Sequence, residues 1–234
     1  MSTSGPRPRP TELASRFAGG YGFSAPALQR VQAAGASLLV SCDCGSSDHE
    51  RLHAARKVGI DSVVIDHHLV PDEALPAVAF LNPHRPECGF PYKGLASCGL
   101  ALVVATALRK ALSKELDVRR WLDLVAVGTI ADVAPLDGDN RALVRAGLRV
   151  LGQGSRIGLR ALSVNGNRGK VIPPKAEDVA YEIGPRLNAP GRLGDPRLAL
   201  DVLLARDPAQ AWSLADSLEQ QTLKRRELQR EIIA

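Results

Sequence analysis

Two groups of residues that lie close together in the sequence could each bind a metal ion. The first is the run HERLH at residues 49–53, which fits the pattern His-Glu-x-x-His of zinc proteases. In that pattern two imidazoles lie one helical turn apart with a glutamate beside them. The second group is the run Asp66, His67 and His68. Carboxylates combined with imidazoles suit Mn²⁺ better than Zn²⁺, so the two groups predict different chemistry.

The zinc-protease interpretation lacks a third ligand. The predicted helix that contains His49 and His53 runs into a strand within a few residues, and neither a following Gly-x-x-His nor a second glutamate helix appears. Three fixed positions in five residues occur often in charged helices. We therefore expect His49 and His53 to be ordinary residues on a solvent-exposed helix face.

The second group gains support from its place in the predicted fold. The run SLLVSCDCG is predicted to be a buried strand and DSVVIDHH a second strand, with a short helix between them. Parallel strands joined in this way end at the same edge of a sheet, where ligands bind in open α/β folds. Asp43 and residues 66–68 are therefore expected to converge, and Asp132, at the end of an apolar helix, could add a third carboxylate. Cys42 and Cys44, which flank Asp43, are expected to be small core residues.

The rest of the pattern predicts an α/β fold, with a parallel sheet flanked by helices and then a helical part. PAVAFLNP predicts a third strand, and the segments from Ala96 onward have helical spacing. IPPKAEDVAYEIGPRLNAPGRLGD is predicted to be a loop with at most one helical turn. A long connecting helix is expected to begin at Pro208, capped by Asp207. The expected divisions are a disordered leader (1–15), a main domain (16–205) and a linker helix (206–234).

Composition sets broad limits. A chain of 234 residues with 45% hydrophobic content can bury one sizeable core. A net charge of +5 allows a polyanionic partner without requiring one. The four cysteines are too few and too irregular for a disulfide framework, and neither an apolar N-terminal signal nor a long uncharged apolar run is present. We therefore expect a cytoplasmic protein without a membrane partner.

Five segments, in order and spacing, resemble the DHH phosphoesterases. They are VSCDCGSSDHE, SVVIDHH, LNPHRPECGFPYKGLASCGLA, VAVGTIADVAPLDGDNRALVRAGL and IGPRLNAPGRLGD. The resemblance covers nearly the whole chain from Arg16 and is closest to the branch that degrades single-stranded DNA. It implies a DHH phosphoesterase domain over residues 16–205 that binds Mn²⁺ or Mg²⁺.

The resemblance also implies roles for single residues. Asp43, His67 and Asp132 correspond to metal ligands, with Asp66 in or beside the ligand shell and His68 facing the scissile phosphate or leaving group. Two ions about 3.5–4 Å apart would activate a water molecule and stabilise the leaving oxygen. The residues implied as phosphate contacts are Arg16, Arg186, Asn188 and Arg192, because guanidinium groups match phosphate oxygens.

Two family features are not found in the sequence. The family begins with a strand carrying Asp-x-Asp, but no Asp or Glu precedes Glu12, and the DHHA1 domain that grips nucleic acid is not found after the long helix. We therefore expect residues 1–234 to be part of a longer exonuclease. Alone, they are expected to bind about one Mn²⁺ weakly and to have negligible nuclease activity until the flanking segments are restored.

Three functions stay open. The leading one is 5′→3′ exonuclease activity on single-stranded DNA, with a single-strand-binding protein or a helicase as further partners. The second is a DHH oligoribonuclease or cyclic-dinucleotide phosphodiesterase. Those proteins have an Asp-Thr-Gly type of third motif, whereas residues 128–132 here are Gly-Thr-Ile-Ala-Asp. The third is a catalytically inactive DHH module that binds DNA or replication proteins.

Overall fold

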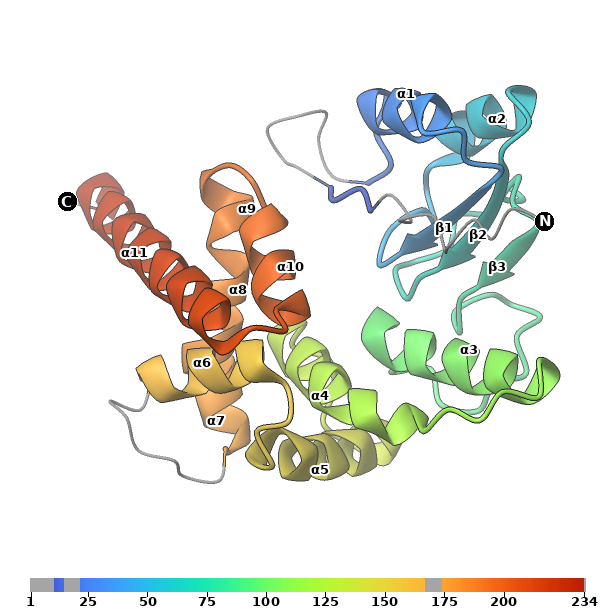
Figure 1. Cartoon of the computed structure of the whole chain (residues 1–234). Helices are drawn as coiled ribbons and strands as arrows, with labels where there is room; N and C mark the ends of the chain where they lie inside the picture. Colours follow the sequence, from blue (N-terminus) through green and yellow to red (C-terminus); the bar gives the residue numbers. More distant parts are fainter. Residues whose placement is uncertain (1–10, 15–21, 167–173, 234) are drawn as a thin grey trace, which may run out of the picture.

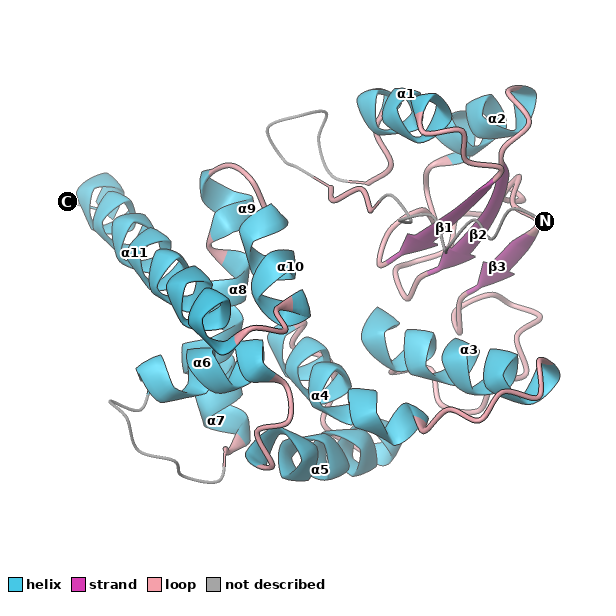
Figure 2. Ribbon diagram, viewed as in Figure 1, coloured by secondary structure: helices cyan, strands magenta, loops and turns pink. Residues whose placement is uncertain are grey.

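The computed structural model describes residues 11–14, 22–166 and 174–233 (Figure 1). Three strands form one parallel sheet in the order β1 (Leu38–Cys42), β2 (Asp61–Ile65) and β3 (Ala79–Leu81). The described helices, with two short irregular ones labelled η, are α1 (Ala25–Ala33), α2 (His49–Lys57), α3 (Ser97–Ala111), η1 (Val118–Trp121), α4 (Leu122–Ala131), α5 (Gly138–Gly152), α6 (Ile157–Gly166), α7 (Ala176–Asp178), η2 (Val179–Ile183), α8 (Gly184–Asn188), α9 (Pro190–Leu193), α10 (Arg197–Leu204) and α11 (Pro208–Ile233). The predicted α/β class is confirmed, and Figure 2 shows the strands confined to one side of the molecule.

The middle strand, β2, packs on both of its faces. Val64 is fully buried with Leu52 and Ala55 of α2, whereas its neighbour Ile65 packs with Leu100 of α3. Successive side chains of a strand point to opposite faces, so the run SVVI supplies apolar groups to both layers. Figure 1 shows the result: α1 and α2 lie over one face of the sheet and α3 over the other.

The outer strand, β1, is less buried than the sequence predicts. Leu38 and Val40 are 54% and 52% exposed, and Cys42 is also exposed. The expectation of a buried strand with core cysteines is therefore wrong for these residues, while Cys44 is half-buried. The physical reason is position: β1 lies at the end of the three-stranded sheet, and α3 contacts β2 instead.

The strands end in one row, and this alignment positions the candidate site. Cys42 pairs with Ile65, and Ile65 pairs with Leu81. The ladder continues one residue further, because the Asp43 N–H donates to the carbonyl of Ile65 and the Asp66 N–H to that of Leu81, both at 3.0 Å. The residues that follow the three strands are therefore neighbours at one sheet edge, as the parallel arrangement requires.

The segment predicted to be a loop is mostly helical. From Ala176 to Leu193 the chain forms α7, the π-helical turn η2, α8 and α9. Pro185 and Pro190 lie in the first turns of α8 and α9, where proline removes no required hydrogen bond. Burial of Val179 against the other helices of this part then stabilises the segment. The prediction of a loop is therefore wrong for this segment. Pro185 and Pro190 mark the starts of helices here and not a loop.

The long last helix begins as predicted. Asp207 Oδ1 accepts a hydrogen bond from the Gln210 N–H at 2.8 Å, and Pro208 is the first helical residue. Ala211, Ala215 and Leu218, in its first half, are fully buried in the helical core. The predicted domain boundaries stay predictions, and most of the expected leader lies outside the described residues. Within the described part of the chain, no helix is long and apolar enough to span a membrane.

Candidate metal centre

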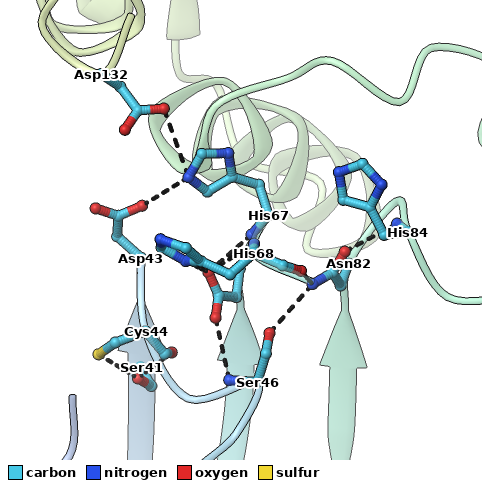
Figure 3. Close-up of polar contacts among 10 residues, drawn as sticks. Ser41, Asp43, Cys44, Ser46, His67, His68, Asn82, His84 and Asp132 are labelled. Atoms are coloured by element: carbon cyan, nitrogen blue, oxygen red, sulfur yellow. Dashed lines mark hydrogen bonds and ion pairs between the residues drawn. The ribbon is translucent and has the colours of Figure 1, made fainter. Parts of the chain in front are cut away.

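Three side chains from two parts of the fold meet at the carboxyl edge of the sheet. His67 Nε2 lies 3.3 Å from Asp43 Oδ1 and 3.5 Å from Asp132 Oδ2 (Figure 3). Asp43 follows β1, His67 follows β2, and Asp132 is the C-cap residue of α4. The structure therefore brings together the three residues that were predicted as metal ligands, although they are up to 89 positions apart in the sequence.

The arrangement fits a divalent metal ion. His67 Nε2 is buried and, among the described residues, has no hydrogen-bond partner, because neither carboxylate contact has hydrogen-bond geometry. A buried polar nitrogen without a partner is costly, and a metal ion between the three groups would satisfy it. Ligands at about 2.1 Å from an ion in octahedral geometry lie about 3 Å from one another, close to the two separations measured from His67 Nε2. One nitrogen and two carboxylates favour Mn²⁺ or Mg²⁺ over Zn²⁺.

Asp66 is a buried support of this edge, and its side chain is not turned to the cluster. It is 1% exposed, and its Oδ2 accepts from the Ser46 N–H at 3.0 Å. Its Oδ1 accepts from the N–H of His67 at 2.8 Å and of His68 at 3.3 Å, and contacts His68 Nδ1 at 2.7 Å. Burial raises the pKa of Asp66, but the hydrogen bonds from Ser46, His68 and His67 outweigh it and the pKa is lowered. The carboxylate therefore stays ionised and fixes both histidines.

His68 directs its ring towards the open side of the site. Its Nδ1 is held by Asp66, and its ring lies edge-on to that of His67 with 4.7 Å between centroids. The side chain is 44% exposed. One of its ring nitrogens lies within 4.8 Å of the ligand atoms of Asp43 and His67. His68 can therefore reach either a metal ion or a group bound beside one.

Two residues that support this edge, Ser46 and Asn82, were not predicted from the sequence. Asn82, directly after β3, donates from Nδ2 to Ser46 Oγ at 3.1 Å and to the carbonyl of His68 at 2.8 Å, and its Oδ1 accepts from the His84 N–H. It therefore ties the β1 loop to the β2 loop (Figure 3). The signal for Asn82 was present, because it follows the third predicted strand just as Asp43 and Asp66 follow the first two.

Asp132 is positioned by the way α4 ends. The N–H of Val133 donates to the carbonyl of Ile130 and that of Ala134 to the carbonyl of Thr129, which together form a Schellman motif. Val133 occupies the position where glycine is usual and has φ of 58°. A β-branched residue rarely adopts this conformation, and backbone strain of this kind is often found at functional sites.

The His-Glu-x-x-His run lies away from this centre. His49 Nε2 contacts the carbonyl of Glu73 at 2.9 Å, and His53 is exposed on α2. Among the described residues, the one group of acidic, histidine or cysteine side chains whose ligand atoms all lie within 4.8 Å of one another is Asp43, His67 and His68, and Asp132 adjoins this group through its contact with His67. Cys44 is not in it, and its Sγ lies 3.2 Å from Ser41 Oγ.

Of the residues predicted to contact phosphate, two line a common cleft and one is buried in ion pairs. Arg186 is 4% exposed, and its guanidinium is bonded to the carboxylates of Glu182 and Glu219. The predicted phosphate contact does not match these surroundings, because a buried cation needs paired anions and Arg186 already has two. Asn188 and Arg192 line a cleft beside the end of α4. Arg16 lies outside the described residues.

Metal affinity is expected to fall in acid. The contact with Asp43 raises the pKa of His67, with Asp132 adding to the effect and burial opposing it, and burial raises the pKa of Asp132. Both groups must lose protons to bind an ion. At a pH below the raised pKa of His67, the affinity for Mn²⁺ should therefore fall about tenfold per pH unit for each proton that the ion displaces. Isothermal titration between about pH 6 and 8 would measure this, and a pH-independent affinity would exclude His67 as a ligand.

Comparisons with known proteins agree with this geometry. Residues 6–129 match the model of the DHH family, N-terminal domain. The single-stranded-DNA-specific exonucleases RecJ of Dickeya dadantii and Escherichia coli are 41% and 39% identical over 92% of this chain. The chain spans only 39% of their length.

Two solved structures are similar. An exonuclease RecJ bound to manganese has a TM-score of 0.82 and 34% identity, over 94% of this chain and 55% of that one. RecJ of Thermus thermophilus in complex with Mn²⁺ has a TM-score of 0.77 and 34% identity, over 88% of this chain and 31% of that one. With the family match over more than half of its residues, these likenesses show that the chain belongs to the DHH family.

Proposed function

We propose that this chain takes part in metal-dependent hydrolysis of phosphodiester bonds in single-stranded DNA, from the 5′ end. The observation that carries the proposal is that the carboxylates of Asp43 and Asp132 both face the buried Nε2 of His67, which has no hydrogen-bond partner among the described residues. The relatives named as single-stranded-DNA-specific exonucleases support the substrate class. The manganese-bound structures of RecJ support Mn²⁺, with Mg²⁺ as the other candidate, as the ion.

The roles of the residues follow from their contacts. We assign Asp43, His67 and Asp132 to hold the ion, which when bound would activate water and stabilise negative charge on a phosphate oxygen. Asp66 fixes the peptide after β2 and the ring of His68. Because Nδ1 of His68 is occupied by Asp66, its Nε2 is the nitrogen that can meet a phosphate or leaving oxygen. Asn82 keeps the two loops together.

We also propose binding partners and a cellular location for this protein. The curated relatives are longer proteins, so a single-strand-binding protein or a helicase as partner, and a cytoplasmic location, rest on the sequence expectations alone. We also keep the expectation that residues 1–234 bind about one Mn²⁺. Cleavage is expected to be weak and to increase when the segments that flank this stretch in the longer relatives are added.

The test is a comparison of substrates on one protein. We would measure binding and product release for a 5′-phosphorylated single strand, its duplex, an RNA strand and a cyclic dinucleotide, each with and without Mn²⁺. The proposal predicts Mn²⁺-dependent preference for the DNA single strand and release of mononucleotides. Preference for the cyclic dinucleotide or RNA would support the second function. Binding of DNA that depends neither on Mn²⁺ nor on Asp43 would support the third function, an inactive module that binds DNA.

A further inference from the structure

A cleft of about 600 Å³ begins beside the metal cluster. Ala131 and Val133, on either side of Asp132, line part of it, and residues of α7, η2, α8, α9 and α11 line most of the rest. Its volume is in the range of sites that bind small molecules of nucleotide size. A group bound in this cleft would therefore lie next to the phosphate that the proposed function places at the metal cluster.

Two arginines from different helices face the cleft. Arg192 comes from α9 and Arg225 from α11, and both are among its lining residues. Burial lowers the pKa of Arg225, and the positive charges of Arg192 and Arg226 lower it further. Within the described part of the chain, neither guanidinium is in an ion pair, in contrast to Arg186 with its two glutamates. The two arginines outnumber the one acidic residue that lines the cleft, Glu177, so the cleft favours binding of an anion such as phosphate.

The same cleft has apolar and aromatic groups on its rim. Tyr181, in η2, is 72% exposed, and Val133, in the turn after α4, is 87% exposed. Val133, which has the positive φ described above, also lines the cleft. An exposed tyrosine near paired arginines is the combination that binds single strands, in which a base stacks on the ring and the backbone follows the positive charges.

We infer that this cleft binds the nucleotides of the single strand that adjoin the scissile phosphate. Arg192 and Arg225 bind the strand's phosphates, and Tyr181 stacks on an unpaired base. This inference rests on the proposed function, since it takes the metal cluster as the point where the strand is cut. It adds a source of single-strand selectivity, because a base inside a duplex is already stacked and cannot lie on Tyr181.

The experiment uses two probes and matched variants. One probe is an oligothymidylate, and the other is the same backbone with abasic sites, which keeps the phosphates and removes the bases. Tyr181→Leu should weaken binding of oligothymidylate about 5- to 100-fold and leave the abasic strand nearly unchanged, whereas Tyr181→Phe should bind both like the wild type. Arg225→Gln should weaken both probes and make the salt dependence shallower by about 0.7 in the log–log slope.

Arg226→Gln is the matched control. It removes the same charge from the next residue of α11, which is exposed and outside the cleft lining, so its effect should be smaller than that of Arg225→Gln. Equal effects of the two arginine variants, or a Tyr181→Leu variant that binds both probes like the wild type, would overturn the inference while leaving the proposed function in place. A wild-type protein that binds Mn²⁺ but neither probe would overturn both.

Discussion

Asp43→Asn is expected to lower the affinity for Mn²⁺ by about 100-fold or more, because it removes a charged ligand from a site with few others. Mn²⁺-dependent binding and cleavage of single-stranded DNA should be lost with the ion. Asparagine is the informative substitution here. Asp43 has φ of 66°, a left-handed conformation that asparagine tolerates as well as aspartate, so the fold should not change.

Asp48→Asn provides the matched control for that loss. Asp48 lies in the same loop, and its Oδ2 accepts from the Phe23 N–H at 2.8 Å, which an amide oxygen can still do. Its charge is outside the cluster, so the affinity for Mn²⁺ should change by less than about threefold. Equal losses in the two variants would mean that general charge near β1, and not ligation by Asp43, attracts the ion.

Asp66→Asn is expected to affect stability and metal binding together. Asp66 accepts from Ser46 with one oxygen and from the His67–His68 segment with the other. An amide has only one acceptor atom, so in either orientation its NH₂ faces a buried donor, which costs about 1–3 kcal/mol in the free energy of unfolding. Loss of this support should also lower the affinity for Mn²⁺ by about 10- to 100-fold. Thermal unfolding and Mn²⁺ titration would measure the two effects.

Asp61→Asn is the control for that change, since Asp61 is an exposed residue at the other end of β2. Its replacement should change neither stability nor metal binding.

The lowered pKa of Asp66 also makes the stability of the fold depend on pH. The stabilisation that it gives is present above the unfolded-state pKa, about 3.9, and is lost as the pH falls through the lower folded-state pKa. Asp66→Asn should therefore reduce the acid dependence of stability. Identical acid unfolding of the variant and the wild type would contradict the role given to this carboxylate.

The sequence predicted the site well where the site depends on strand ends. Asp43 and Asp66 follow apolar runs, and parallel strands bring their ends to one edge, so no distant contact had to be known. Asp132 was within reach because a helix end followed by a sharp turn is visible in the sequence. Asn82 follows the same rule, but it was not predicted because a neutral amide carries neither the charge nor the acid–base chemistry that marks a metal or catalytic residue in a sequence.

Other features depend on contacts between distant segments, which local patterns do not contain. The pairing of Arg186 with Glu182 has helical spacing, but its second partner, Glu219, comes from α11 and could not be inferred. The exposure of Val40 depends on which strand α3 covers. The helices from Ala176 to Leu193 were mistaken for a loop because proline both begins and breaks helices.

The most direct test of the metal centre is a Mn²⁺ titration, followed by electron paramagnetic resonance, of three proteins. They are the wild type, His67→Ala, and the double variant His49→Ala with His53→Ala. The geometry at the sheet edge predicts that the wild type and the double variant bind Mn²⁺ with equal affinity, and that His67→Ala loses the bound ion. Loss of the ion in the double variant, or its retention in His67→Ala, would contradict the assignment of the site.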